Sequence, residues 1–223
     1  MDIYYFFKSR VDFVRQFYDT ASTPYVERKR LINSQEGQFV PPYSEDGEPA
    51  FLDEWTEADE SLHVLAYSCI SMLASALHLY LESWVRQSRV PINATTRKVA
   101  FKNGWLGGYG AHFFDNFQID FTASPANVQL LEEVILARNS IAHPSSITTH
   151  RAQYSNSDFK KLRSPFFVSE TEFALFADID GDKSWMIPAT VHVSEEQLST
   201  AISEIENFAE WFEKTIISAT SIR

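Results

Sequence analysis

Apolar side chains recur at helical spacing along most of this chain. The pattern predicts a helix over residues 2–19, a second short helix over 24–32 opened by a proline, and a closing helix over 195–217. Nothing interrupts the helical pattern over residues 53–87, which predicts a helix about 50 Å long. The closing helix begins with a Ser-x-x-Gln capping box. These elements predict a mainly α-helical protein.

Three further segments complete the expected architecture. Residues 34–50 are rich in proline and glycine and predict a loop, while residues 104–117 predict a turn that leads into a short aromatic helix or loop. Residues 125–142 predict a helix that starts at Ser124-Pro125 and carries two adjoining apolar stripes. A helix with two such stripes is packed on two sides, either by neighbours in the bundle or by a second subunit.

Residues 165–193 are the one strand-like region. Apolar positions alternate on both sides of a polar turn, which predicts a small β-hairpin insertion. The turn begins Asp-x-Asp-x-Asp from Asp178, as a calcium-binding loop does, but Lys183 and Ala189 occupy the positions that need glycine and a bidentate glutamate. We therefore expect a plain polar turn and no metal site.

The 223 residues, of which 44% are hydrophobic, are sufficient for one sizeable core. We expect a single domain over residues 1–223. Cys69 is the only cysteine, which excludes a disulfide framework, and we expect it to be buried and inert. Residues 62–81 carry no formal charge, but serines and histidines interrupt them, so we expect a central bundle helix, no membrane contact and a cytoplasmic location.

The formal charge of −11 disfavours a polyanionic partner, but the cations are clustered. Residues 83–112 hold five Lys or Arg and no acid, and residues 138–163 hold five against one acid. These are either solvated loop charges or a local phosphate-binding surface. The second interpretation assigns RNA contacts to four cations: Arg97, Lys98, Lys102 and Arg151.

The segment from Arg138 to Pro144 holds the strongest candidate for chemistry. It places Arg138, Asn139 and His143 at the end of an apolar helix, and Pro144 should end that helix. A histidine at a helix C-terminus is favoured in its protonated form, and a guanidinium suits phosphate. These groups could cleave RNA without a metal or other cofactor, by attack of a 2′-hydroxyl on the adjacent phosphorus. The alternative is a structural cluster that ties a helix end to a loop.

This Arg-Asn-x-x-x-His motif, with Ile141-Ala142 before the histidine, resembles the Arg-x4-6-His signature of the HEPN superfamily. The preceding Gly104-Trp105-Leu106 segment and the proline-started helix are also similar to prokaryotic HEPN proteins. The resemblance covers about residues 53–145 and implies that these form the core of the domain, completed by the terminal helices. The resemblance implies a helical bundle that forms a homodimer, in which both subunits contribute to a ribonuclease cleft used by toxins and phage-defence effectors. It implies that Arg138 and His143 are the catalytic pair and that Asn139 supports them.

Three functional hypotheses follow, of which the third is a purely structural partner subunit with no basic cleft between protomers. The first is a metal-independent HEPN endoribonuclease, with an antitoxin or nucleotidyltransferase as a partner. The second is a catalytically silent HEPN module that binds a nucleotide, RNA or a partner protein. Among the other histidines we expect His63 and His78 to be core residues and His150 to be a secondary site candidate.

Overall fold

The structure is a computed structural model that describes residues 2–43, 49–144, 147, 150–162, 164–178 and 189–221. It is mainly helical, as the sequence predicts. The elements in chain order are α1 Ile3–Ser34, η1 Gly37–Phe39, α2 Leu52–Ser88, α3 Ala94–Val99, η2 Phe101–Asn103, α4 Trp105–Phe117, η3 Phe121–Ala123, α5 Val128–Ala142, α6 Asn156–Phe159, α7 Glu170–Asp178 and α8 Glu195–Ser221.

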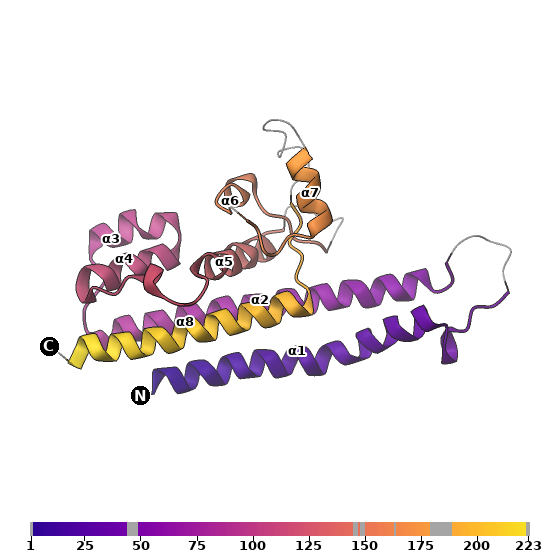
Figure 1. Cartoon of the computed structure of the whole chain (residues 1–223), viewed down its shortest axis with the longest axis horizontal. Helices are drawn as coiled ribbons and strands as arrows, with labels where there is room; N and C mark the ends of the chain where they lie inside the picture. The colour runs from indigo at the N-terminus through magenta and orange to yellow at the C-terminus, as the bar shows by residue number, and fades with distance from the viewer. Residues whose placement is uncertain are drawn as a thin grey trace.

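Three long helices, α1, α2 and α8, run along the long axis of the molecule, and α5 packs on α2 and α8 (Figure 1). The short helices α3 and α4 cover one end of this bundle, whereas α6 and α7 stand out from it near the end of α5. The α1–α2 pair extends beyond the rest of the bundle as a two-helix projection. The buried apolar side chains form one continuous cluster that includes α1, α2, α4, α5 and α8.

α2 is the central helix of the bundle. Twelve of its residues are buried, and Leu73, Leu77 and Leu81 are fully enclosed. Among the described residues, α2 alone is long and apolar enough to be a candidate membrane span, and most of its apolar stretch is buried inside the structure. A mostly buried core helix passes the same test, so this candidate is weak evidence for a membrane.

α1 corrects one expectation. A single helix covers Ile3–Ser34, where the sequence predicted two, and Pro24 lies inside it. Proline removes one helical hydrogen bond. The hydroxyls of Ser22 and Thr23 both donate to the Asp19 carbonyl in the turn before Pro24, and Val14, Tyr18 and Ser22 are buried. Packing and these local bonds therefore carry the helix through the proline.

The caps of α5 and α8 show one correction and one confirmation. α5 begins at Val128 instead of Pro125, because the Asn127 side chain caps it by accepting from the Leu130 amide at 3.1 Å. The predicted capping box of α8 is confirmed, since the Gln197 amide donates to Ser194 Oγ and the Ser194 amide donates to Gln197 Oε1.

The predicted hairpin over residues 165–193 is wrong in its first arm, which forms the helix α7. The expected turn lies outside the described residues. Residues 189–193 are extended, and Thr190 forms an isolated antiparallel bridge with Gln153 instead of pairing within a hairpin. The bridge is flanked by two backbone bonds of 2.8 Å, from Tyr154 to Ala189 and from Val191 to Ala152. The alternating apolar residues of 189–193 thus serve a long-range pairing.

Candidate functional site

The predicted motif lies at the C-terminal end of α5. The helix ends at Ala142, and His143 is its C-cap, with φ −128° and ψ 67°. The His143 amide still donates to the Asn139 carbonyl at 3.1 Å, so the chain leaves the helix directly before Pro144, as predicted. The end of the helix therefore fixes the position of the His143 side chain at the surface of the bundle.

The three motif side chains lie at the surface. Arg138 and His143 are exposed and Asn139 is half-buried, and Arg138 Nη1 donates to Asn139 Oδ1 at 3.1 Å. Within the described part of the chain, no hydrogen bond joins Arg138 to His143, and none ties their side chains to another element. The carboxamide can thus orient the guanidinium, while both candidate catalytic groups stay open to solvent.

Glu133, two turns earlier on α5, has the opposite environment. It is only 2% exposed, and its carboxylate accepts from the amides of Phe166 and Phe167 at 2.8 and 2.7 Å and from the Tyr154 hydroxyl at 3.2 Å. Burial raises the pKa of Glu133, although these three donors oppose the shift. Glu133 therefore fastens the 154 and 166–167 segments to α5.

The two apolar stripes of α5 are already covered within one chain. Eight of its fifteen residues are buried, and the helix contacts both α2 and α8. The bundle neighbours thus account for the double stripe, which was one of the two explanations that the sequence left open. The stripe by itself no longer requires a second subunit.

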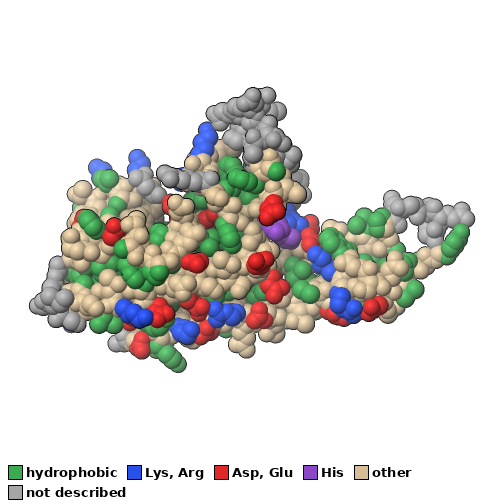
Figure 2. Space-filling model, in the orientation of Figure 1, with side chains coloured by type: hydrophobic (Ala, Val, Ile, Leu, Met, Phe, Trp, Pro, Cys, Tyr) green, Lys and Arg blue, Asp and Glu red, His purple; other side chains and the backbone are tan. Residues whose placement is uncertain are grey.

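The four predicted RNA-contacting cations do not lie together in one chain. Arg97, Lys98 and Lys102 are exposed on α3 and η2, beside the C-terminal end of α2. Arg151 instead pairs with Asp59 near the other end of α2 at 2.9 Å. Asp59 and Arg86 are 27 positions apart on that helix, about 40 Å at the standard rise. On the face in Figure 2, basic and acidic side chains are mixed.

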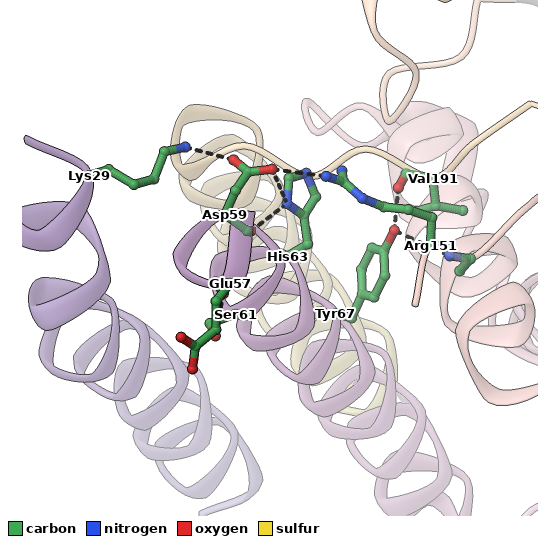
Figure 3. A network of polar contacts seen from close by, with 9 residues as sticks. Lys29, Glu57, Asp59, Ser61, His63, Tyr67, Arg151 and Val191 are labelled. Atoms are coloured by element: carbon green, nitrogen blue, oxygen red, sulfur yellow. Dashed lines mark hydrogen bonds and ion pairs between the residues drawn. The ribbon is translucent and has the colours of Figure 1, made fainter. Parts of the chain in front are cut away.

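Arg151 belongs to a polar network that the sequence did not predict (Figure 3). Asp59 accepts from Lys29 at 2.6 Å and from Arg151 at 2.9 Å, and His63 Nδ1 lies 2.8 Å from the Asp59 carbonyl oxygen. Burial would raise the pKa of Asp59, but Lys29, His63 and Arg151 together hold it below its ordinary value. The His192 ring lies 5.5 Å from the His63 ring.

Tyr67, two turns further along α2, also connects α2 to the segments around Arg151 and His192. Its hydroxyl donates to the Val191 carbonyl and accepts from the Ala152 amide at 3.3 Å (Figure 3). The hydroxyl thereby bridges the two extended segments that carry Arg151 and His192. This region is best interpreted as a structural junction, because each of its charges already has a partner within the fold.

The remaining histidines and the cysteine have different environments. His63 was expected to be a core histidine with its hydrogen bonds satisfied; it is hydrogen-bonded in the polar network but only half-buried, and burial lowers its pKa. His78 is also half-buried and contacts the Tyr109 hydroxyl at 3.3 Å. His150 is exposed beside the groove between α1 and α2. Cys69 is fully buried, as predicted, and burial raises the pKa of its thiol to about 12.

Sequence reasoning missed Glu133 and Asp59 for different reasons. Glu133 occupies a position within the apolar stripes of its helix, and an acid at such a position is a usable signal of a buried acceptor. Asp59 gives no local signal, because its partners Lys29 and Arg151 are 30 and 92 positions away.

Comparison of the chain with protein-family models, with curated proteins and with solved structures gave no match.

Proposed function

We propose that this protein is a metal-independent endoribonuclease of the HEPN type, acting in the cytoplasm as a toxin or phage-defence effector. The observation that supports this most is the exposure of Arg138 and His143 at one helix end, with Asn139 bonded to the guanidinium. A purely structural cluster would have these groups bonded to a neighbouring element.

The proposed reaction needs only the substrate and these side chains. The 2′-hydroxyl of RNA loses its proton to a base and attacks the adjacent phosphorus, and the 5′-oxygen leaves as it gains a proton. His143 moves one of these protons, and Arg138 stabilises the charge that builds on the phosphoryl oxygens. A second subunit would supply the other imidazole and would turn an exposed surface into a cleft.

The proposed homodimer has a candidate surface on α1 and α2 instead of α5. Eight large apolar side chains are exposed on these two helices, and the candidate surface uses five of them, each exposed by between 36% and 58%: Phe6, Phe13, Phe17, Val64 and Leu79. At roughly 150–250 Å² for each whole aromatic side chain, the exposed parts provide several hundred Å² toward the ~800 Å² that each partner of a standard interface buries. His150 lies beside this α1–α2 groove, so His143 is at most about 25 Å along the chain from it.

Light scattering tests the dimer. We expect the wild-type chain to be dimeric at micromolar concentration and Phe13→Asp to be monomeric while remaining helical by circular dichroism. Arg28→Ala, at the other end of α1, is the control and should remain dimeric. A monomeric wild-type protein, or a Phe13→Asp dimer, contradicts this interface.

Cleavage chemistry tests the function. The protein should cut single-stranded RNA in the presence of EDTA and leave a 2′,3′-cyclic phosphate or its hydrolysis product. An RNA with one 2′-deoxy nucleotide at the cut site lacks the nucleophile and should not be cut there. Cleavage of this analogue at an undiminished rate would rule out the mechanism.

The second candidate function is a silent HEPN module that binds RNA, a nucleotide or a partner protein. The charge of −11 and the separation of Arg151 from Arg97 favour this module with a nucleotide or a partner protein as its ligand, because a surface that holds an RNA strand is usually basic. Binding of RNA without cleavage by the dimer would support this second function. An adjacent gene for an antitoxin or a nucleotidyltransferase would support the first.

A further inference from the structure

A pocket of about 700 Å³ lies where the C-terminal end of α2 meets α3 and α4, and none of the motif residues lines it. Its wall includes three arginines: Arg86 in the last turn of α2, Arg89 at the C-cap of the same helix, and Arg97 on α3. Pockets of 300–1,000 Å³ are typical of small-molecule sites. Three arginines that line one pocket favour an anionic ligand.

Two of these guanidinium groups have uncompensated charge. Arg86 pairs with Glu82 on the same helix at 2.7 Å. Over the described ranges, no carboxylate forms an ion pair with Arg89 or Arg97. The chain has 30 acidic against 19 basic side chains, so two unpaired arginines in one pocket are a distinct feature of this surface. An arginine without a partner can give its paired donors to a phosphate.

The other side of the pocket is aromatic and apolar. Phe101 and the buried Tyr109 pack edge to face at 5.2 Å, and the Tyr109 hydroxyl lies 3.3 Å from His78 Nε2. Burial, with a smaller contribution from Glu82, raises the pKa of Tyr109 to about 12, so the phenol stays neutral. Gly108 lets Phe101 lie against α4, because a Cβ there would meet the ring at 2.3 Å.

We propose that this pocket binds a small organic phosphate, with the phosphate on Arg89 and Arg97 and an apolar or aromatic ring against Phe101. The ring of the ligand would cover the apolar wall of the pocket, whereas inorganic phosphate would leave that wall exposed to water. Glu82 disfavours a strand with further phosphates, because its carboxylate stands in the same pocket. The proposal uses none of the catalytic candidates Arg138, Asn139 and His143, but Arg97 is also one of the four cations to which the sequence assigns RNA contacts.

Calorimetric titration of the whole chain at low salt tests the proposal with four probes: phenyl phosphate, AMP, inorganic phosphate and phenol. We expect phenyl phosphate and AMP to bind saturably, and at least about tenfold more tightly than inorganic phosphate or phenol. Arg89→Ala and Arg97→Ala should each weaken AMP about tenfold or more, the loss that one charge-assisted bond gives.

The controls separate this site from the motif and from general charge. Arg28→Ala, a change on the surface of α1, should leave AMP affinity unchanged, and so should His143→Ala. Three results would each overturn the proposal: no saturable binding of AMP or phenyl phosphate at millimolar concentration, AMP binding that survives the double Arg89→Ala/Arg97→Ala variant, or a single-stranded RNA that binds through these arginines more tightly than AMP. Loss of nuclease activity alone does not bear on this site.

Discussion

Glu133 and the Arg138–His143 motif lie on the same helix but in opposite environments. Glu133 is buried, and three donors satisfy its carboxylate. The motif side chains are at the surface, and within the described part of the chain their one side-chain bond joins Arg138 to its neighbour Asn139. A polar group that holds a fold is saturated by its own chain, whereas one that acts on a ligand keeps its donors and protons accessible. This contrast predicts that substitutions in the motif lower activity, whereas substitution of Glu133 lowers the free energy of unfolding.

The largest expected effect is on catalysis by the exposed Arg138–His143 motif. His143→Ala should lower the rate of RNA cleavage by about 10²–10⁴-fold, the usual contribution of general acid–base catalysis. The urea midpoint should not change, because the imidazole is exposed. Single-turnover cleavage and urea unfolding measure the two quantities, and Glu132→Ala is the matched control on α5.

Two variants of Arg138 distinguish the contribution of its charge from that of its planar geometry. Arg138→Ala should lower the cleavage rate strongly, and Arg138→Lys should restore part of it, since an ammonium keeps the charge but lacks the planar fork of donors. Equal rates for the alanine and lysine variants would contradict a role in stabilising phosphoryl charge. RNA affinity should be measured alongside the rate, so that binding and chemistry are distinguished.

Glu133 should show the opposite behaviour. Glu133→Ala leaves the Phe166 and Phe167 amides without their acceptor, and a buried unsatisfied donor such as the Phe167 amide costs about 1–3 kcal/mol. We expect a clear fall in the free energy of unfolding, measured in urea, and no direct change in the chemistry of the folded fraction. A Glu133→Ala protein with wild-type stability would show that the carboxylate is not an anchor.

The pH dependence of stability reports on a second buried polar group. His112 is fully buried, its Nε2 has no hydrogen-bond partner among the described residues, and burial lowers its pKa. A lowered folded pKa means that its contribution is present above the unfolded value of ~6.5 and is lost as pH falls through the folded value. The slope is at most about 1.4 kcal/mol per pH unit. His112→Phe should flatten this acid limb in urea unfolding.

The smallest expected effect is at the Asp59 network. Arg151→Ala removes one partner of a part-exposed ion pair, and we expect a loss of about 1 kcal/mol or less. It should leave RNA affinity unchanged. Lys98→Ala, at an exposed site, should weaken RNA binding and reduce the slope of log affinity against log salt by about one. A loss of RNA affinity in Arg151→Ala but not in Lys98→Ala would instead assign Arg151 to the RNA-contacting cations.

Local patterns predicted the long helices well, because a 3.6-residue period over many turns has no competing interpretation. They also placed the end of α5, since Pro144 acts on its immediate neighbour. They failed at α7, where a short alternating stretch is compatible with either structure, and at Pro24, where packing outweighs one lost bond. They could not assign Arg151, because its partner is 92 positions away.

The backbone bond between the Phe167 carbonyl and the His192 amide, 2.8 Å long, has a consequence for the evolution of the chain. The two ends of this segment therefore meet, and α7 within it stands out from the bundle and contacts the extended segment at Thr190, whose amide donates to Glu172. Such an excursion is the mark of an insertion, because its ends meet and loop closure costs little more for a long loop than for a short one. A gene in which a short glycine-serine turn replaces residues 170–188 should still encode a folded bundle, and relatives should differ most in the length of this segment.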